Sequence, residues 1–235
     1  LSLPSPDEPW LKSFSEGLFS MADICRCELI GGDTTRGPLN ICITVFGEVP
    51  VGQALRRDKA QYGDDIWISG SIGDARLALA HCLEEIELKP EEVKAVVPNL
   101  QMPIPRVALG MELRKIAHAA LDLSDGLMGD LNHILDASNV GATINVDALP
   151  ISPVLAKQPR ERQLYCALSG GDDYELCFTA PVSMRSRILE ASTRTGVPVT
   201  RIGYIENEKG LRIKNSAGEI QNLPFTSFDH FSTAQ

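Results

Sequence analysis

The chain has 235 residues, of which 43% are hydrophobic, and its formal net charge is −9 with a sequence pI near 5.0. This length and composition allow a sizeable buried core, in one large domain or two small ones. The acidic balance argues against general electrostatic binding of nucleic acid or anionic lipid, because there is no surplus of Lys and Arg to displace counterions.

The first sixty residues predict one helix between short strands. Residues 1–4 read as the end of a strand, and Ser5 is the expected N-cap of a helix whose apolar residues recur at helical spacing up to Cys25. The segments 27–31 and 39–49 are predicted to be the two strands of a hairpin, since the second is rich in β-branched residues. So short a segment cannot build a core of its own, and we expect that residues upstream of it are missing.

The rest of the chain alternates between strand and helix patterns. A polar stretch ends near Tyr62, where we place a boundary between domains 1–61 and 62–235. Strands are predicted at DIWIS, before DLSDGL, and at ATINVDAL, YELCFTA and VTRIGYIE; helices are predicted at 73–85, from about 90, and at 106–121, 129–138 and 184–196. The fold class is therefore α+β or mixed α/β, with helices on a sheet that need not be wholly parallel.

Three acidic, glycine-bearing loops are the candidate functional segments: GGDTTRG at 31–37, DLSDGLMGD at 122–130 and SGGDDYEL at 169–176. Glycines allow a backbone to approach a phosphate closely, and Mg²⁺ prefers carboxylate oxygens, which makes Asp33, Asp122 and Asp125 suitable ligands. For any one loop alone, Asp-Gly turn chemistry is a sufficient explanation. The sequence has no GxxxxGK[ST] phosphate loop, kinase catalytic loop, GxSxG or HExxH motif.

The remaining polar residues are less specific. Six cysteines lack CxxC spacing and are interpreted as reduced, mostly buried thiols, with metal binding by Cys25 and Cys27 as the weaker alternative. Together with the absence of a membrane-length apolar run or signal pattern, they indicate the cytoplasm. Arg56 and Arg57 either bind phosphate or form a solvated linker pair. The four histidines are interpreted as structural or exposed.

The order of the motifs resembles a known family. GGDT, then RRDKAQYGDDIWISGSIGDA, DLSDGL, SGGDDYELCF and finally FDHF are similar to the thiamine-monophosphate kinases, over nearly the whole chain. That family belongs to the aminoimidazole ribonucleotide synthetase superfamily. The resemblance implies a partial N-terminal α/β domain of a homodimer and a C-terminal α+β domain with helices on a mixed sheet. The family's N-terminal segment, with further acidic residues and strands, has no counterpart here.

The resemblance also implies roles for individual residues. Asp33, Asp122 and Asp125 would bind Mg²⁺, while Gly32, Asp33, Arg57 and Ser124 would contact ATP. Asp172, where relatives often have Glu, would face thiamine monophosphate together with Phe228, whose ring could stack on it. No catalytic side chain is expected, because the metal ions would assist the transfer.

The expected reaction is direct in-line transfer of the γ-phosphoryl group of ATP to thiamine monophosphate, giving thiamine diphosphate. One alternative is another ATP-dependent synthetase of the superfamily, which activates an amide or carbonyl oxygen. The other is a non-catalytic nucleotide-binding module.

Overall fold

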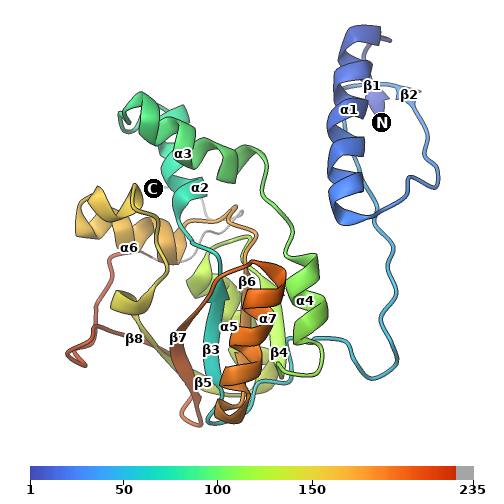
Figure 1. Ribbon diagram of the computed structural model, residues 1–235. Helices are drawn as coiled ribbons and strands as arrows, with labels where there is room; N and C mark the ends of the chain where they lie inside the picture. The colour runs from blue at the N-terminus through green and yellow to red at the C-terminus, as the bar shows by residue number, and fades with distance from the viewer. Residues whose placement is uncertain (226–235) are drawn as a thin grey trace. The chain divides into compact units, whose positions relative to one another are not determined.

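The computed structural model describes residues 1–225 (Figure 1). Two compact units are present, Leu1–Pro50 and the part of the chain from Val51 onward, and each is described by itself. The division between residues 61 and 62 stays a prediction.

The first unit is a helix packed beside two very short strands. Strand β1 (Ser2–Leu3) runs parallel to β2 (Thr35–Arg36), and α1 (Glu8–Cys25) lies between them in sequence. The helix is capped by Asp7, whose carboxylate accepts a hydrogen bond from the Trp10 amide at 3.1 Å. The predicted cap, Ser5, is therefore wrong by two residues, because Asp7 is the residue that meets the free amides of the first turn.

The predicted hairpin of this unit is wrong. Residues 27–31 form no strand, and the β-branched segment 39–49 contributes only an isolated bridge between Asn40 and Ser2. Ile41, Ile43 and Val45 are exposed. Within residues 1–225 no segment extends this bridge into a ladder, so strand propensity alone does not make the stretch a strand.

The second unit is built on a six-stranded mixed sheet with strand order β4-β6-β3-β7-β5-β8. The strands are β3 (Asp65–Ser69), β4 (Ala119–Asp122), β5 (Gly141–Asn145), β6 (Leu176–Ala180), β7 (Val199–Glu206) and β8 (Gly210–Lys214). Every pairing is antiparallel except that of β5 with β8. The predicted mixed sheet is confirmed.

Helices cover both faces of this sheet. On one face, α5 (Leu127–Ser138) and α6 (Arg160–Ser169) pack Leu131, Ile134 and Leu168 against buried residues of the strands. On the other, α4 (Val107–Leu113) and α7 (Arg185–Thr195) pack around Trp67 and Phe178. In Figure 1, α7 stands in front of the sheet and α5 behind it. A third cluster joins α2 (Asp74–Cys82) to α3 (Pro90–Gln101) and α6.

Some predicted elements differ in length. The helix expected at 106–121 ends at Leu113, because residues from Ala119 onward pair with β6 and must be extended. The strand expected at 142–149 ends at Asn145 and continues as a single turn of 3₁₀ helix. Helix α6 and strand β8 were not predicted.

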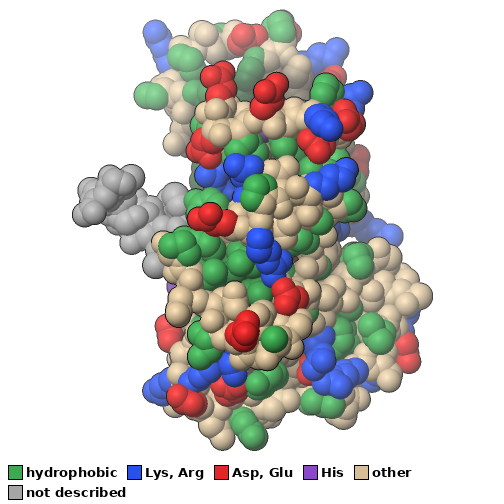
Figure 2. Space-filling model, turned by 90° about the vertical axis from the view of Figure 1, so that its left-hand side faces the viewer, with side chains coloured by type: hydrophobic (Ala, Val, Ile, Leu, Met, Phe, Trp, Pro, Cys, Tyr) green, Lys and Arg blue, Asp and Glu red, His purple; other side chains and the backbone are tan. Residues whose placement is uncertain are grey.

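The cysteines differ from the expectation of mostly buried thiols. All six are free, but Cys166 and Cys177 alone are buried, and burial raises the pKa of Cys166 to about 11. Among the described residues, no helix is long and apolar enough to span a membrane. Figure 2 shows acidic and basic side chains interspersed over the face drawn there, without a continuous basic surface.

Candidate functional site

Two of the three acidic loops lie side by side at one edge of the sheet. Strands β4 and β6 are antiparallel neighbours with Asp122 opposite Leu176, so the loop after β4 and the loop before β6 leave the sheet together. Three backbone hydrogen bonds join them: Leu123 N to Glu175 O at 2.8 Å, Tyr174 N to Leu123 O at 2.8 Å, and Asp172 N to Ser124 O at 2.9 Å. Two segments that are distant in the sequence thus form one surface.

Glycines permit this close approach. A Cβ atom on Gly171 would lie 2.2 Å from the carbonyl oxygen of Ser124. A Cβ atom on Gly126, where φ is +101°, would lie 2.9 Å from the carbonyl oxygen of Gly170. Any side chain at these positions would push the two loops apart.

Asp130 holds the backbone of the loop that follows β4. Its carboxylate is buried and accepts hydrogen bonds from the amides of Ser124 at 2.9 Å and Asp125 at 3.0 Å. Burial raises the pKa of Asp130, those two hydrogen bonds lower it, and the negative charges of Asp125 and Asp122 raise it further. Asp122 and Asp125 therefore lie close enough to act on the same carboxyl group.

The second loop alternates between residues that turn inward and residues that turn outward. Asp173 accepts from the amide of Gly73 through both oxygens, at 2.9 and 2.8 Å, at the start of α2. Glu175 is buried, and its carboxylate accepts hydrogen bonds from Nε and Nη2 of Arg106 and from the hydroxyl of Ser69. Asp172 and Tyr174 have φ of +66° and +49°, a left-handed conformation that is uncommon outside glycine.

The phenol group of Tyr174 is influenced by carboxylates of both loops. Burial raises the pKa of Tyr174. The pKa is raised further by the negative charges of Asp172, Asp122 and Asp125 and by a hydrogen bond with Asp172. Carboxylates from both loops thus act on one phenol group. Among residues 1–225, no three His, Cys, Asp or Glu side chains are grouped so as to hold a metal ion on their own. Mg²⁺ commonly binds through one or two carboxylates plus substrate phosphates and water, so the Asp122 and Asp125 pair fits that ion.

Asp122 also borders an open cavity of about 580 Å³. Arg56, Arg57 and Asp58 line its other side. Arg56 is held by the carboxylate of Asp58 through two hydrogen bonds, at 2.7 and 2.6 Å, while Arg57 is exposed. The volume suits a small-molecule ligand.

The structure brings some of the predicted site residues together. Asp122, Ser124, Asp125 and Asp172 belong to the joined loops, and Arg57 shares a cavity with Asp122. Gly32 and Asp33 are exposed in the first unit, where Asp33 accepts the Thr34 amide at 2.8 Å. Phe228 lies outside the described residues.

Sequence reasoning missed four residues that shape this site: Arg106, Asp130, Asp173 and Tyr174. Three of them stand inside the motifs already singled out, so the motif alone could have drawn attention to them. Arg106 has no such signal, because only the fold brings it to Glu175.

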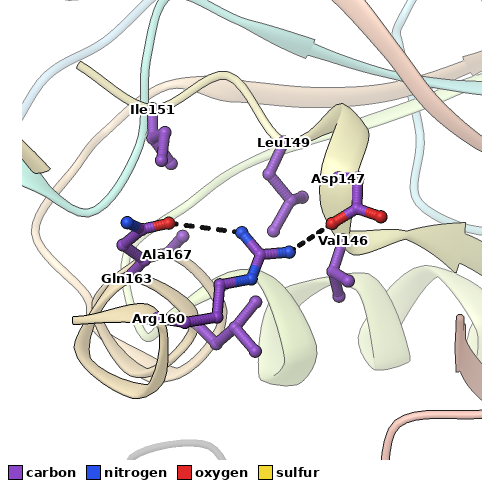
Figure 3. A pocket seen from close by; sticks show the side chains of 8 residues that line it. Val146, Asp147, Leu149, Ile151, Arg160, Gln163 and Ala167 are labelled. Carbon is purple, nitrogen blue, oxygen red and sulfur yellow. Dashed lines mark hydrogen bonds and ion pairs between the residues drawn. The ribbon is translucent and has the colours of Figure 1, made fainter. Parts of the chain in front are cut away.

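A second, smaller pocket offers less room for a ligand (Figure 3). Its volume is about 90 Å³, and Arg160 lies across it, bound to Asp147 at 2.5 Å and to Gln163 at 3.2 Å. Leu149 and Ile151 point into the same space. The charge of Arg160 is neutralised within the protein, and the volume is below that of ordinary ligand pockets.

Comparison with known proteins gives these loops their context. Residues 1–49 match the family described as AIR synthase related protein, N-terminal domain, and residues 61–215 match its C-terminal domain. Thiamine-monophosphate kinase of Salmonella typhimurium is 42% identical over 236 residues, which cover 99% of this chain and 72% of that protein. The chain belongs to the thiamine-monophosphate kinase family. The resemblance seen in the sequence motifs is thereby confirmed.

Solved structures of thiamine-monophosphate kinases share the fold. The crystal structure of the enzyme from Stenotrophomonas maltophilia has a TM-score of 0.84 and 44% identity, covering 92% of this chain and 71% of that one. AaThiL complexed with AMPPCP and TMP has a TM-score of 0.75 and 26% identity, covering 98% of this chain and 72% of that one. Escherichia coli HypE, a hydrogenase maturation protein, is 19% identical with a TM-score of 0.75, which shows a shared fold alone.

Proposed function

We propose that this protein transfers the γ-phosphoryl group of ATP to the phosphate of thiamine monophosphate, giving thiamine diphosphate and ADP. Membership of the thiamine-monophosphate kinase family carries the proposal. The relative solved with AMPPCP and TMP supports the same pair of substrates. In the described residues, the two joined acidic loops are the feature suited to this reaction.

Asp122 and Asp125 are the proposed Mg²⁺ ligands of the second unit, and Asp33 is the proposed ligand of the first. Several bound Mg²⁺ ions would screen the charges of two phosphate groups and polarise their oxygens. The support in the structure for Asp122 and Asp125 is the chemistry of the donors: their loop is joined to the second acidic loop, and Asp122 borders a cavity large enough for a substrate. The protein's contribution is to position these carboxylates.

We propose that ATP is contacted by Gly32, Asp33, Arg57 and Ser124. Arg57 is exposed at the cavity that Asp122 also borders. A guanidinium can donate two parallel hydrogen bonds to two oxygens of a phosphate group. The amide of Ser124 donates to Asp130 and its carbonyl accepts from Asp172. Its hydroxyl is therefore the group that we propose for the nucleotide.

Asp172 and Phe228 are proposed to contact thiamine monophosphate. The backbone of Asp172 is tied to Ser124, and its carboxylate influences Tyr174 on the outward side of the loop. A carboxylate there suits a cationic substrate.

The transfer needs no general base. The acceptor is a phosphate monoester that is already an anion near neutral pH, so one of its oxygens can attack the γ-phosphorus directly. A new P–O bond forms as the bond to the β-phosphate oxygen of ATP breaks, and ADP leaves with that electron pair. The enzyme's task is to hold two anions in line, which explains why the site offers carboxylates and an arginine rather than a nucleophile.

The test follows formation of thiamine diphosphate and ADP from ATP, Mg²⁺ and thiamine monophosphate. It is run on this chain and on a version extended by the N-terminal part of the Salmonella typhimurium relative. Stoichiometric thiamine diphosphate from either version supports the kinase. ADP release without thiamine diphosphate would favour the synthetase alternative, and ATP binding without turnover in both would favour a non-catalytic module.

We also propose that the protein is a homodimer and resides in the cytoplasm. The first follows from the family resemblance and the second from the sequence features described above.

A further inference from the structure

The segment that carries Arg57 has little regular structure of its own. Residues 51–60 form turns and a single isolated bridge, between Arg56 and Ala119 on the edge strand β4. In that bridge the amide of Ala120 donates to the carbonyl oxygen of Arg56 at 3.3 Å, which is long for a backbone hydrogen bond. The placement of Arg57 therefore depends on further contacts.

Ser138 supplies those contacts from the last turn of α5. Its hydroxyl group donates a hydrogen bond to the carbonyl oxygen of Arg57 at 3.0 Å and accepts one from the amide of Ala60 at 3.1 Å. A serine or threonine hydroxyl in a helix commonly bonds to the carbonyl four residues earlier, as Thr193 does with Leu189 in α7. Ser138 instead bonds to a segment 81 residues earlier in the chain, and one hydroxyl group closes the turn from Arg57 to Ala60.

The two arginines of this segment differ in how their charges are used. The guanidinium of Arg56 donates to both carboxylate oxygens of Asp58, at 2.7 and 2.6 Å, and these hydrogen bonds lower the pKa of Asp58 to about 2. Arg57 lines the same cavity and is exposed, and within residues 1–225 its guanidinium takes part in no ion pair. Arg57 is thus the cation of this cavity that stays available for a phosphate group.

We propose that Ser138 is a positioning residue for Arg57, through which the end of α5 sets the strength of ATP binding. The inference rests on the proposed function, in which Arg57 contacts the phosphates of ATP. A flexible arginine loses conformational freedom when it binds a phosphate group, and a backbone that is already fixed reduces that cost. Helix α5 follows the loop that carries Asp125, so one helix would link a proposed Mg²⁺ ligand to the proposed phosphate contact.

The test compares Ser138→Ala with Ser138→Thr, which keeps the hydroxyl group, and with Ser192→Ala as the matched control. Ser192 is also half-buried in the last turn of a helix, and its hydroxyl donates to the carbonyl oxygen of Val197 at 2.6 Å, beyond the end of α7. Binding of ATP with Mg²⁺ is titrated by calorimetry. The kcat and the KM for each substrate are measured from the formation of thiamine diphosphate.

Ser138→Ala is expected to raise Kd and KM for ATP about fivefold, while kcat and KM for thiamine monophosphate stay within about twofold of wild type. Ser138→Thr and Ser192→Ala should stay within about twofold of wild type in all these constants. Loss of a hydrogen bond that serves stability alone would lower the melting temperatures of Ser138→Ala and Ser192→Ala without singling out ATP. If Ser138→Ala does not fold, Ser138→Cys replaces it, because a thiol is a weaker donor and acceptor than a hydroxyl group.

A double-mutant cycle shows whether Ser138 acts through Arg57. Arg57→Ala is expected to raise Kd for ATP about tenfold, and adding Ser138→Ala to it should change Kd by less than about twofold. Effects that multiply in the double variant, or a Ser138→Ala protein that binds ATP as Ser192→Ala does, would overturn the inference while leaving the kinase activity standing. A wild-type protein that binds ATP but forms no thiamine diphosphate would remove the proposed kinase function, while the cycle would still test the link between Ser138 and Arg57.

Discussion

The amide of Asp172 donates a hydrogen bond to the carbonyl oxygen of Ser124 at 2.9 Å. This contact joins the loop that precedes β6 to the loop that follows β4. Asp122 and Asp125, proposed as Mg²⁺ ligands, and Asp172, proposed as a substrate contact, therefore stand on two loops that are joined through the backbone, and their placement depends on the register of two antiparallel strands.

The first prediction concerns a proposed metal ligand. Asp125→Asn is expected to lower kcat on the order of 100-fold, because an amide is a poorer ligand for Mg²⁺ than a carboxylate. Circular dichroism and thermal melting should match wild type. Asp136→Asn, an exposed carboxylate on α5, is the control and should keep full activity. Near-normal turnover of Asp125→Asn at saturating Mg²⁺ would count against the proposed metal site.

The second prediction concerns the close approach of the loops. Gly171→Ala places a methyl group against the Ser124 carbonyl, so the loops must separate. We expect a loss of about 2 kcal/mol in the free energy of unfolding and at least roughly tenfold in kcat/KM. Gly17→Ala adds its methyl in open space within α1 and should leave kcat/KM unchanged. Unaltered activity of Gly171→Ala would show that the spacing of the loops does not matter.

The third prediction separates a buried ion pair from an exposed one. Glu175→Ala leaves Arg106 partly buried without its carboxylate and should lower the free energy of unfolding by about 3 kcal/mol. Glu112→Ala breaks the exposed pair with Arg194 and should cost less than about 1 kcal/mol. Urea denaturation of both variants checks the difference. Similar values for the two would contradict the anchoring role of Glu175.

The fourth prediction concerns acid stability at the opposite end of the sheet. Burial raises the pKa of Asp65, but hydrogen bonds from Arg185 and Arg201 outweigh it, so the pKa is lowered overall. A lowered folded-state pKa gives stability that is present above the unfolded value of about 3.9 and is lost as pH falls through the folded value. Arg185→Gln should be less stable by about 2 kcal/mol at pH 7 and should lose less stability than wild type between about pH 5 and pH 3. Parallel acid dependences in the two proteins would contradict this account.

Much of the second unit could be predicted from sequence, because its elements carry strong local patterns. The alternating or continuous apolar runs at β3, β6 and β7 fall within or next to the predicted segments. Helix α4 was predicted too long, because the helical pattern of the sequence continues into residues that form strand β4 in the structure. Segment 39–49 has equally strong β propensity, but a strand needs a partner, and propensity does not say where the partner lies.

The candidate site was predictable in part for the same reason. Asp122, Ser124, Asp125 and Asp172 stand in motifs that sequence alone singles out. Their joining through Leu123 and Tyr174 depends on strand pairing between segments distant in the chain. The tertiary fold likewise brings Pro103 and Val107 to Leu176, with which they line one open cavity.

The most direct test of the central claim follows the γ-phosphate itself. The protein is incubated with ATP labelled at the γ-phosphorus, Mg²⁺ and thiamine monophosphate, and the labelled products are separated by chromatography. The account predicts that the label appears in the terminal phosphate of thiamine diphosphate, and that Asp125→Asn slows its appearance severely. Label recovered as inorganic phosphate, released only when thiamine monophosphate is present and without any thiamine diphosphate, would contradict the account.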